Sequence, residues 1–219
     1  MVSAVITAAG KNRRMREDLL SRGMKIEHKL LMDLNGKPVI IRTIENVLKS
    51  GVKNCVVVLG HYSDEIKAVL KEFSDKRVEI INNQDINCEL SQTLLNGVKN
   101  IESGLCLCVA ADQPTVTNET MTKLIENAMK YENAENIVSV LARKENGFLE
   151  SAEGLGMPFV CHTNLLLNYL PGHQDNLNPI LRKMISNNVV FYGTTAHNDL
   201  ELININRYND YIFVKKRLI

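Results

Sequence analysis

The chain has 219 residues, of which 45% are hydrophobic and 23% are charged. These values are typical of a globular protein with a sizeable core, and the length suits one large α/β domain spanning 1–219. The net charge of +1 gives no reason to expect nucleic acid or an anionic membrane surface as a partner. No run of 18 apolar residues is present, so no membrane-spanning helix is expected.

The five cysteines are odd in number and scattered along the chain. No secretory signal precedes the first strand, so we expect a cytoplasmic protein without a disulfide framework. Cys106 and Cys108 would share one face of a strand, and Cys161-His162 could add metal ligands. The closely paired spacing of a zinc site is missing, however, and small buried hydrophobic residues are the simpler interpretation.

Residues 2–15 (VSAVITAAGKNRRM) combine an apolar run, a turn of small residues and a group of basic side chains. The apolar run suits a strand buried on both faces. Small and then basic residues follow it: Ala8, Ala9, Gly10, Lys11, Arg13 and Arg14. Backbone amides can approach a ligand closely at such a turn, and beside fixed cations they form an anion site, for which phosphate is the expected anion. The alternative is an ordinary turn with solvated charges.

Residues 16–28 (REDLLSRGMKIEH) are crowded with charge and show no sustained helical stripe, so a mobile, solvated loop is predicted there. Asn35-Gly36 indicates a hairpin turn. An amphipathic helix then runs from Val39 until Gly51 ends it.

Strands and helices alternate through the rest of the first two thirds of the chain. A continuous apolar run at residues 55–59 and an apolar stretch at 105–111 predict buried strands, and further strands are expected at 78–81 and 137–141, with helical stripes between them. This alternation predicts a three-layer, doubly wound α/β fold with a mostly parallel sheet. The last third is less regular: we expect a strand near 156–160, helices at 163–170 and 177–185, a final strand at 200–205 and a closing helix from Asn206.

Ligands bind beyond the carboxyl ends of the strands in sheets of this kind. Gly10, Gly60, Asn83 and Asp112 directly follow the first four predicted strands. The sequence therefore predicts a binding site at this edge of the sheet.

Asp112 is the sharpest candidate for chemistry, because a carboxylate there, with Pro114 turning the chain, would project over the sheet edge. It would suit Mg²⁺, which usually takes one or two carboxylates and the phosphates of a substrate; a turn or capping aspartate is the alternative. Lys29 and Arg14 could reach such phosphates, or could be ordinary surface cations. No glycine belongs to a dinucleotide-binding or P-loop motif.

Several stretches, in order, resemble the MobA-like NTP transferases, and among them the molybdenum cofactor cytidylyltransferases. They are TAAGKNRRM, Lys29-Leu30-Leu31, GKPV, VVLGH, SQTLLNGV, AADQP, GMP and NINRYNDY. The likeness runs from Val2 to about Tyr211. It implies a Rossmann-like nucleotidyltransferase fold in which about 1–142 bind the nucleotide and about 143–219 form the irregular acceptor-side half.

The resemblance also implies a role for each matching residue. The NTP would be held by Ala8, Ala9, Gly10, Lys11, Arg14 and Lys29, with Gly60 and Asn83 lining the base pocket. Mg²⁺ would be held by Asp112, completed by Asn204 or Asn206, while Gln113 and Pro114 would face the acceptor. Arg14, Lys29 and Asp112 would be the catalytic residues.

The resemblance implies an Mg²⁺-dependent transfer of a nucleoside monophosphate from an NTP to a phosphorylated acceptor, such as molybdopterin. CTP is the expected nucleotide, followed by GTP. The expected protein partner is a molybdoenzyme or a cofactor-insertion protein. Arg16 replaces the family's glycine, the charged insertion 16–28 follows it, and Gly172-His173 replaces a Gly-Asp pair. These departures leave open a sugar-phosphate or alcohol-phosphate acceptor, or a nucleotide-binding regulator without catalysis.

Overall fold

The computed structural model describes residues 1–143, 146–174 and 176–218. Its centre is an eight-stranded sheet in the order β5-β4-β1-β6-β9-β7-β10-β8. The strands are β1 (Val2–Ala8), β4 (Asn54–Leu59), β5 (Val78–Asn82), β6 (Leu105–Ala110), β7 (Ile137–Ala142), β8 (Gly147–Phe148), β9 (Phe159–His162) and β10 (Val190–Thr195). Outside this sheet, β2 (Asp33–Leu34) and β3 (Lys37–Pro38) form the predicted hairpin around Asn35-Gly36.

The sheet is mostly parallel, as predicted. β1 pairs in parallel with β4 and β6, β4 with β5, and β7 with β10. β9 is antiparallel to both of its neighbours, so β6 and β7 point the same way across it. The carboxyl ends of β5, β4, β1, β6, β7 and β10 therefore meet along one edge, which is where the sequence places the candidate residues.

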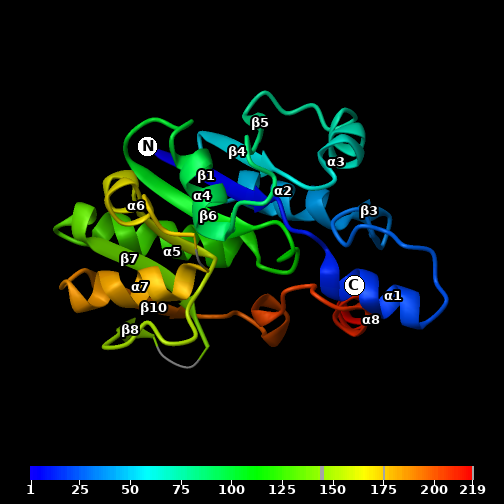
Figure 1. The fold of residues 1–219 in the computed structure, drawn as a ribbon. Helices are drawn as coiled ribbons and strands as arrows, with labels where there is room; N and C mark the ends of the chain where they lie inside the picture. Colours follow the sequence, from blue (N-terminus) through cyan, green and yellow to red (C-terminus); the bar gives the residue numbers. More distant parts are fainter. Residues whose placement is uncertain (144–145, 175, 219) are drawn as a thin grey trace.

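Helices cover both faces of the sheet and complete the three predicted layers (Figure 1). They are α1 (Arg13–Ser21), α2 (Val39–Lys49), α3 (Ser63–Leu70), α4 (Leu90–Val98), α5 (Asn118–Lys130), α6 (Thr163–Tyr169), α7 (Leu177–Ser186) and α8 (Tyr208–Arg217), with 3-10 turns η1 (Ala134–Asn136) and η2 (Asp199–Leu202). Successive side chains of a strand point to opposite faces. Ala4 and Ile6 of β1 accordingly pack with α1, α2, α3, α5 and α8, whereas Val5 packs with α4, α6 and α7.

The prediction of a mobile, solvated loop at 16–28 is wrong for residues 16–21, which are helical, whereas residues 22–27 are exposed and form neither helix nor strand. Helix α1 extends to Ser21, and its Leu19, like Met15 one turn earlier, is buried in the core. Only these two side chains of the helix are buried, so the apolar stripe is too short to stand out among the charges. Helix α1 also packs against α8, near the end of the chain (Figure 1).

The predicted final strand at 200–205 is also wrong. Residues 199–202 form η2, because the fully buried carboxylate of Glu201 turns inward and accepts hydrogen bonds from Thr117 and Thr120 at the start of α5. The sheet instead gains β10, a strand that the sequence analysis did not predict, beside β7.

Four of the five cysteines are buried, as expected: Cys55, Cys106, Cys108 and Cys161. Burial raises the pKa of the Cys55, Cys108 and Cys161 thiols, which makes them poor nucleophiles. Within the residues that the structure describes, no group of three or more His, Cys, Asp or Glu side chains could hold a metal ion. None of the helices found there has the length and apolarity needed to cross a membrane.

Candidate active site

A cleft of about 460 Å³ lies where β1 and β6 end. Six segments that are distant in sequence line it: the turn after β1, residues 28–30, the start of α4, the end of β6, Asn176 just before α7, and residues near 204–206. The cleft brings together most of the candidate residues: Ala8, Ala9, Gly10, Lys11, Arg14, Lys29, Asp112, Asn204 and Asn206.

The turn after β1 forms one wall of the cleft. Gly10 lines the cleft, and an added Cβ on it would meet nothing within 4 Å, so packing does not require a glycine at this position. Asn12 has the left-handed φ of 56° and turns the chain into α1. Because free amides and the positive end of the dipole lie at a helix N-terminus, this wall suits an anion.

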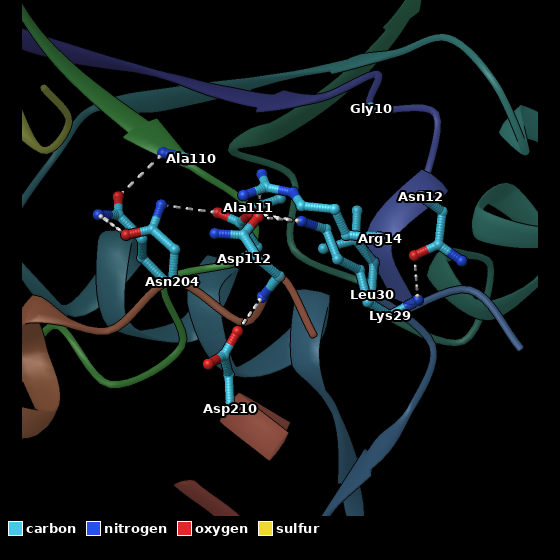
Figure 2. Close-up of polar contacts among 12 residues, drawn as sticks. Gly10, Asn12, Arg14, Lys29, Leu30, Ala110, Ala111, Asp112, Asn204 and Asp210 are labelled. Atoms are coloured by element: carbon cyan, nitrogen blue, oxygen red, sulfur yellow. Dashed lines mark hydrogen bonds and ion pairs between the residues drawn. The ribbon is translucent and has the colours of Figure 1, made fainter. Parts of the chain in front are cut away.

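Two cations and two oxygen-bearing side chains meet above this turn. Lys29 Nζ lies 2.6 Å from Asp112 Oδ2 and donates to Asn206 Oδ1 at 3.2 Å. Arg14 Nη2 donates to the same Asn206 oxygen at 2.9 Å. The Lys29 and Asp112 side chains are only 14% and 15% exposed, so their ion pair is less screened than a surface pair (Figure 2).

Asn204 holds the other oxygen of Asp112. Its Nδ2 donates to Asp112 Oδ1 at 3.3 Å, and its own Oδ1 accepts from Gln113 Nε2 at 3.2 Å (Figure 2). The backbone N–H of Ile205 donates to the Asp112 carbonyl at 2.9 Å, which fastens the segment between these two asparagines to the end of β6. Asn206 is thus the asparagine whose oxygen faces the cations.

The segment that carries Lys29 is tied to the turn after β1 by two side chains. Asn12 accepts from the Lys29 backbone N–H at 3.3 Å and donates to the Glu27 carbonyl at 3.1 Å. The buried His28 lies with Nε2 3.5 Å from the Gly10 carbonyl, while its Nδ1 accepts from Leu30 N–H at 3.3 Å. Burial lowers the pKa of His28 to about 4, so the ring is neutral at pH 7.

Asn12 and His28 are absent from the sequence-based set of site residues. The sequence could have indicated Asn12 as a site residue, because it stands between the basic residues Lys11 and Arg13. His28 has no signal of its own, because its two contacts depend on how the charged insertion folds back.

Two predicted base-pocket residues lie outside the lining of the cleft. An added Cβ on Gly60 would come within 2.8 Å of the Ala9 Cβ, so Gly60 lets the second strand end close against the turn after β1. Asn83 is buried, donates to Thr93 Oγ1 at 2.9 Å and accepts from Asn96 Nδ2 at 2.8 Å. The lining contains Thr93 rather than Asn83 itself.

A second cavity of about 290 Å³ adjoins the cleft and shares Leu90, Ala110, Asn176 and Asn204 with it. Gln113 lines this cavity, with Arg143 as its basic side chain among the described residues. Pro114 lines neither space; it is buried, and its carbonyl accepts from Asn46. The two spaces together could hold two molecules side by side.

The donor set above the turn fits a hard divalent cation. Asp112 Oδ2 and Asn206 Oδ1 already share one positive group, the Lys29 ammonium. Carboxylate and amide oxygens are ligands that Mg²⁺ accepts, usually with phosphate oxygens of a substrate. The charge and chemistry of the residues therefore match the group that the resemblance implies.

Residues 4–189 match the family model described as the MobA-like NTP transferase domain. The solved structure of a nucleotidyl transferase from Methanothermobacter thermautotroptrophicus (Mth528) is 39% identical in sequence to this chain, with a TM-score of 0.92 over 99% of this chain and 97% of that one. The 4-diphosphocytidyl-2C-methyl-D-erythritol synthase of Anaerococcus prevotii shares the fold, at 16% identity and a TM-score of 0.71 over 100% of this chain and 96% of that one.

Among curated proteins, the bifunctional protein GlmU of Bacillus subtilis is 26% identical over 145 residues, which are 66% of this chain and 29% of that protein. The chain thus matches less than a third of the length of this relative. The family model, in contrast, covers most of the chain, from β1 to the residue before β10. The chain therefore belongs to the MobA-like NTP transferase family, a family of nucleotidyltransferases.

Proposed function

We propose that this protein transfers a nucleoside monophosphate from an NTP to a phosphorylated acceptor and releases pyrophosphate. One observation carries the proposal: Arg14, Lys29 and Asp112 meet over the turn after β1, in a cleft that continues into a second cavity. The triphosphate would lie in the cleft and the acceptor in the second cavity.

In this reaction a phosphate oxygen of the acceptor attacks the α-phosphorus of the NTP. A new P–O bond forms while the bond to the bridging β-phosphate oxygen breaks, and pyrophosphate leaves with that electron pair. The chain need supply no covalent intermediate. Lys29, Arg14 and the amides around Gly10 would hold the triphosphate in line and offset the negative charge that develops on its oxygens.

Asp112 and Asn206 would hold the Mg²⁺. When bound, it would supply charge neutralisation on the triphosphate. Lys29, which pairs with Asp112 in this structure, would then be available to the phosphates. Asn204 would keep its hydrogen bond to Asp112 Oδ1 while Oδ2 faces the metal ion.

CTP is the proposed nucleotide, with GTP next, and molybdopterin the proposed acceptor. The order of the motifs supports this choice, and the name of the Anaerococcus neighbour supports a cytidyl donor. Arg143 in the second cavity offers a charge partner for the acceptor phosphate. A cofactor-insertion protein or molybdoenzyme as partner, and a cytoplasmic location, would follow from this reaction.

An alcohol phosphate or sugar phosphate is the second candidate acceptor. The observation that favours it is the activity after which the Anaerococcus neighbour is named, that of a 4-diphosphocytidyl-2C-methyl-D-erythritol synthase. Leucine, amide and glycine groups dominate the lining of the second cavity, and they would suit a small hydroxylated molecule as well.

A pyrophosphate-release screen separates these candidates. Four NTPs are each tested with Mg²⁺ against molybdopterin and against a panel of sugar and alcohol phosphates. Fastest release with CTP and molybdopterin supports the first candidate, and fastest release with another panel member supports the second. Calorimetric NTP binding without pyrophosphate from any pair would instead indicate a nucleotide-binding regulator.

A further inference from the structure

Gln113 is fixed in one orientation by backbone groups whose polarity cannot change. Its Oε1 accepts from the Ala110 N–H at 3.4 Å, and its Nε2 donates to the Met157 carbonyl at 2.8 Å. An amide nitrogen can only donate to a carbonyl, and an amide oxygen can only accept from an N–H. Rotating the Gln113 amide by 180° would break both contacts. Gln113 as a whole is only 3% exposed, so water does not offer a substitute for either partner.

This orientation sets the orientation of the next amide. The second hydrogen of Gln113 Nε2 points to Asn204 Oδ1 at 3.2 Å, so Asn204 must turn its Nδ2 toward Asp112 Oδ1, at 3.3 Å. A flipped Asn204 would place an oxygen against a carboxylate oxygen and an N–H against an N–H. The orientation that the Ala110 N–H and the Met157 carbonyl impose on Gln113 thereby fixes the orientation of Asn204, and through it the contact to Asp112. Figure 2 shows Ala110, Asn204 and Asp112 in this series of hydrogen bonds.

We infer that Gln113 is a positioning residue that acts through Asn204 to hold Asp112 with Oδ1 engaged and Oδ2 facing the cation. This inference rests on the proposed function for the identity of that cation and of the reaction. It differs from the role that the resemblance implies for Gln113, which is direct contact with the acceptor. Every polar atom of its side chain is already bonded within the protein.

Gln113 also links the two spaces of the site. It lines the second cavity, whereas Asp112 lines the cleft, and Asn204 lines both. An acceptor that pushed against the Gln113–Asn204 pair would therefore act on the carboxylate that faces the cation. The acceptor would thus affect the position of the Asp112 carboxylate without contacting Asp112 directly.

The test replaces one donor at a time with an isosteric oxygen. Gln113→Glu removes the hydrogen bonds to Met157 and Asn204, and Asn204→Asp removes the donor to Asp112. Asn127→Asp is the matched control, because Asn127 also donates its Nδ2 to a side-chain oxygen, that of Thr194 at 2.9 Å, but lies in α5 away from the site. Thermal unfolding of each variant shows whether it folds.

The main measurement is Mn²⁺ affinity of the full chain with CTP present, followed by electron paramagnetic resonance. Loss of a side chain that orients a metal ligand typically weakens metal binding by about 10- to 100-fold. We expect a weakening of this size for Gln113→Glu and Asn204→Asp, and none for Asn127→Asp. The kcat for pyrophosphate release should fall in the same two variants and stay at the parental value in Asn127→Asp.

Folded Gln113→Glu and Asn204→Asp proteins that bind Mn²⁺–CTP like the parent chain overturn the inference and leave the proposed function standing. A parent chain that binds Mn²⁺–CTP but releases no pyrophosphate with any acceptor contradicts the proposed reaction, while weaker Mn²⁺ binding in the two variants still supports the role of Gln113. A parent chain that binds no Mn²⁺–CTP overturns both.

Discussion

The ammonium of Lys29 lies 2.6 Å from the Oδ2 atom of Asp112, although the two residues are 83 positions apart in the chain. Lys29 follows the charged insertion, and Asp112 follows β6. Only the fold brings them together, over a turn that presents free amides. A paired cation and carboxylate at such a place can serve two ligands, an anionic phosphate and the divalent cation that accompanies it.

Lys29→Met and Asp112→Asn should each slow pyrophosphate release by about 10²–10³-fold, the usual loss when one preorganised charge contact is removed. Both changes keep the size of the side chain, so the fold should survive. Steady-state kinetics with saturating CTP and acceptor measure the effect. Lys37→Met is the control, because Lys37 pairs with Glu45 at a similar distance, 2.7 Å, on the exposed surface. Near-parental turnover in Lys29→Met or Asp112→Asn would refute the assignment of these two residues.

The buried His28 should make stability fall in mild acid. Burial lowers the pKa of this ring from 6.5 to about 4, so the unfolded chain takes up the proton at a higher pH than the native chain. The stabilisation is therefore complete above about pH 6.5 and declines as the pH falls, by about 3 kcal/mol at pH 4. Urea unfolding at pH 7 and pH 4.5 would measure the decline.

The comparison that isolates His28 is its replacement by glutamine. His28→Gln should flatten the part of the stability–pH curve between pH 6.5 and pH 4, while His197→Gln should leave it unchanged because His197 is exposed. Identical curves for the parent chain and His28→Gln would show that protonation of this ring does not control acid stability.

The α/β architecture could be predicted because its strands are buried on both faces. The runs CVVVL and LCLCVA need no tertiary information to be identified as strands, and the helices between them carry clear apolar stripes. The meeting of Gly10 and Asp112 at one edge follows from parallel pairing of β1 with β6. The sheet topology is therefore sufficient to predict at which edge of the sheet the site lies.

The missed features all depend on contacts between distant segments. Helix α1 is stabilised by core packing of Met15 and Leu19 and by its contact with α8, which no local pattern encodes. Leu200 and Leu202 resemble an alternating strand, yet Glu201 between them points into the protein rather than to solvent. The alternation of apolar and polar residues therefore gives the wrong prediction here, because the charged residue of the segment is the one that is buried.

Glu201 should be among the most sensitive positions for stability. Its carboxylate accepts from Thr117 N–H and Oγ1, from Thr120 Oγ1, and from His197 N–H at 2.6 Å. Glu201→Ala would leave all four donors without this partner, the buried Thr120 hydroxyl among them, at a cost of about 3 kcal/mol or more in the free energy of unfolding. Denaturant unfolding measures this cost.

Glu102→Ala is the control for Glu201→Ala, because Glu102 pairs with Lys53 on the exposed surface and should contribute less than about 1 kcal/mol. Since η2 precedes Asn204 and Asn206, Glu201→Ala should also weaken Mn²⁺ binding. Equal stability of the Glu201→Ala and Glu102→Ala proteins would contradict the role of Glu201 as the anchor of this segment.

Two glycines near the turn after β1 should respond to alanine in opposite ways: Gly10 lies in the turn and lines the cleft, and Gly60 packs against Ala9 of the turn. A Cβ at Gly60 would lie 2.8 Å from the Ala9 Cβ and 3.1 Å from the Ala9 carbonyl oxygen, so the turn after β1 must shift. Gly60→Ala should lower the free energy of unfolding by about 1–3 kcal/mol, as expected for overpacking.

In Gly10→Ala, by contrast, the added Cβ meets no neighbour within 4 Å, so the free energy of unfolding should stay nearly unchanged. Its methyl group, however, would occupy space at the cleft and should raise the KM for CTP. Denaturant unfolding and steady-state kinetics on both variants separate the two effects, and a stable Gly60→Ala protein with a parental KM would show that this close contact does not shape the turn.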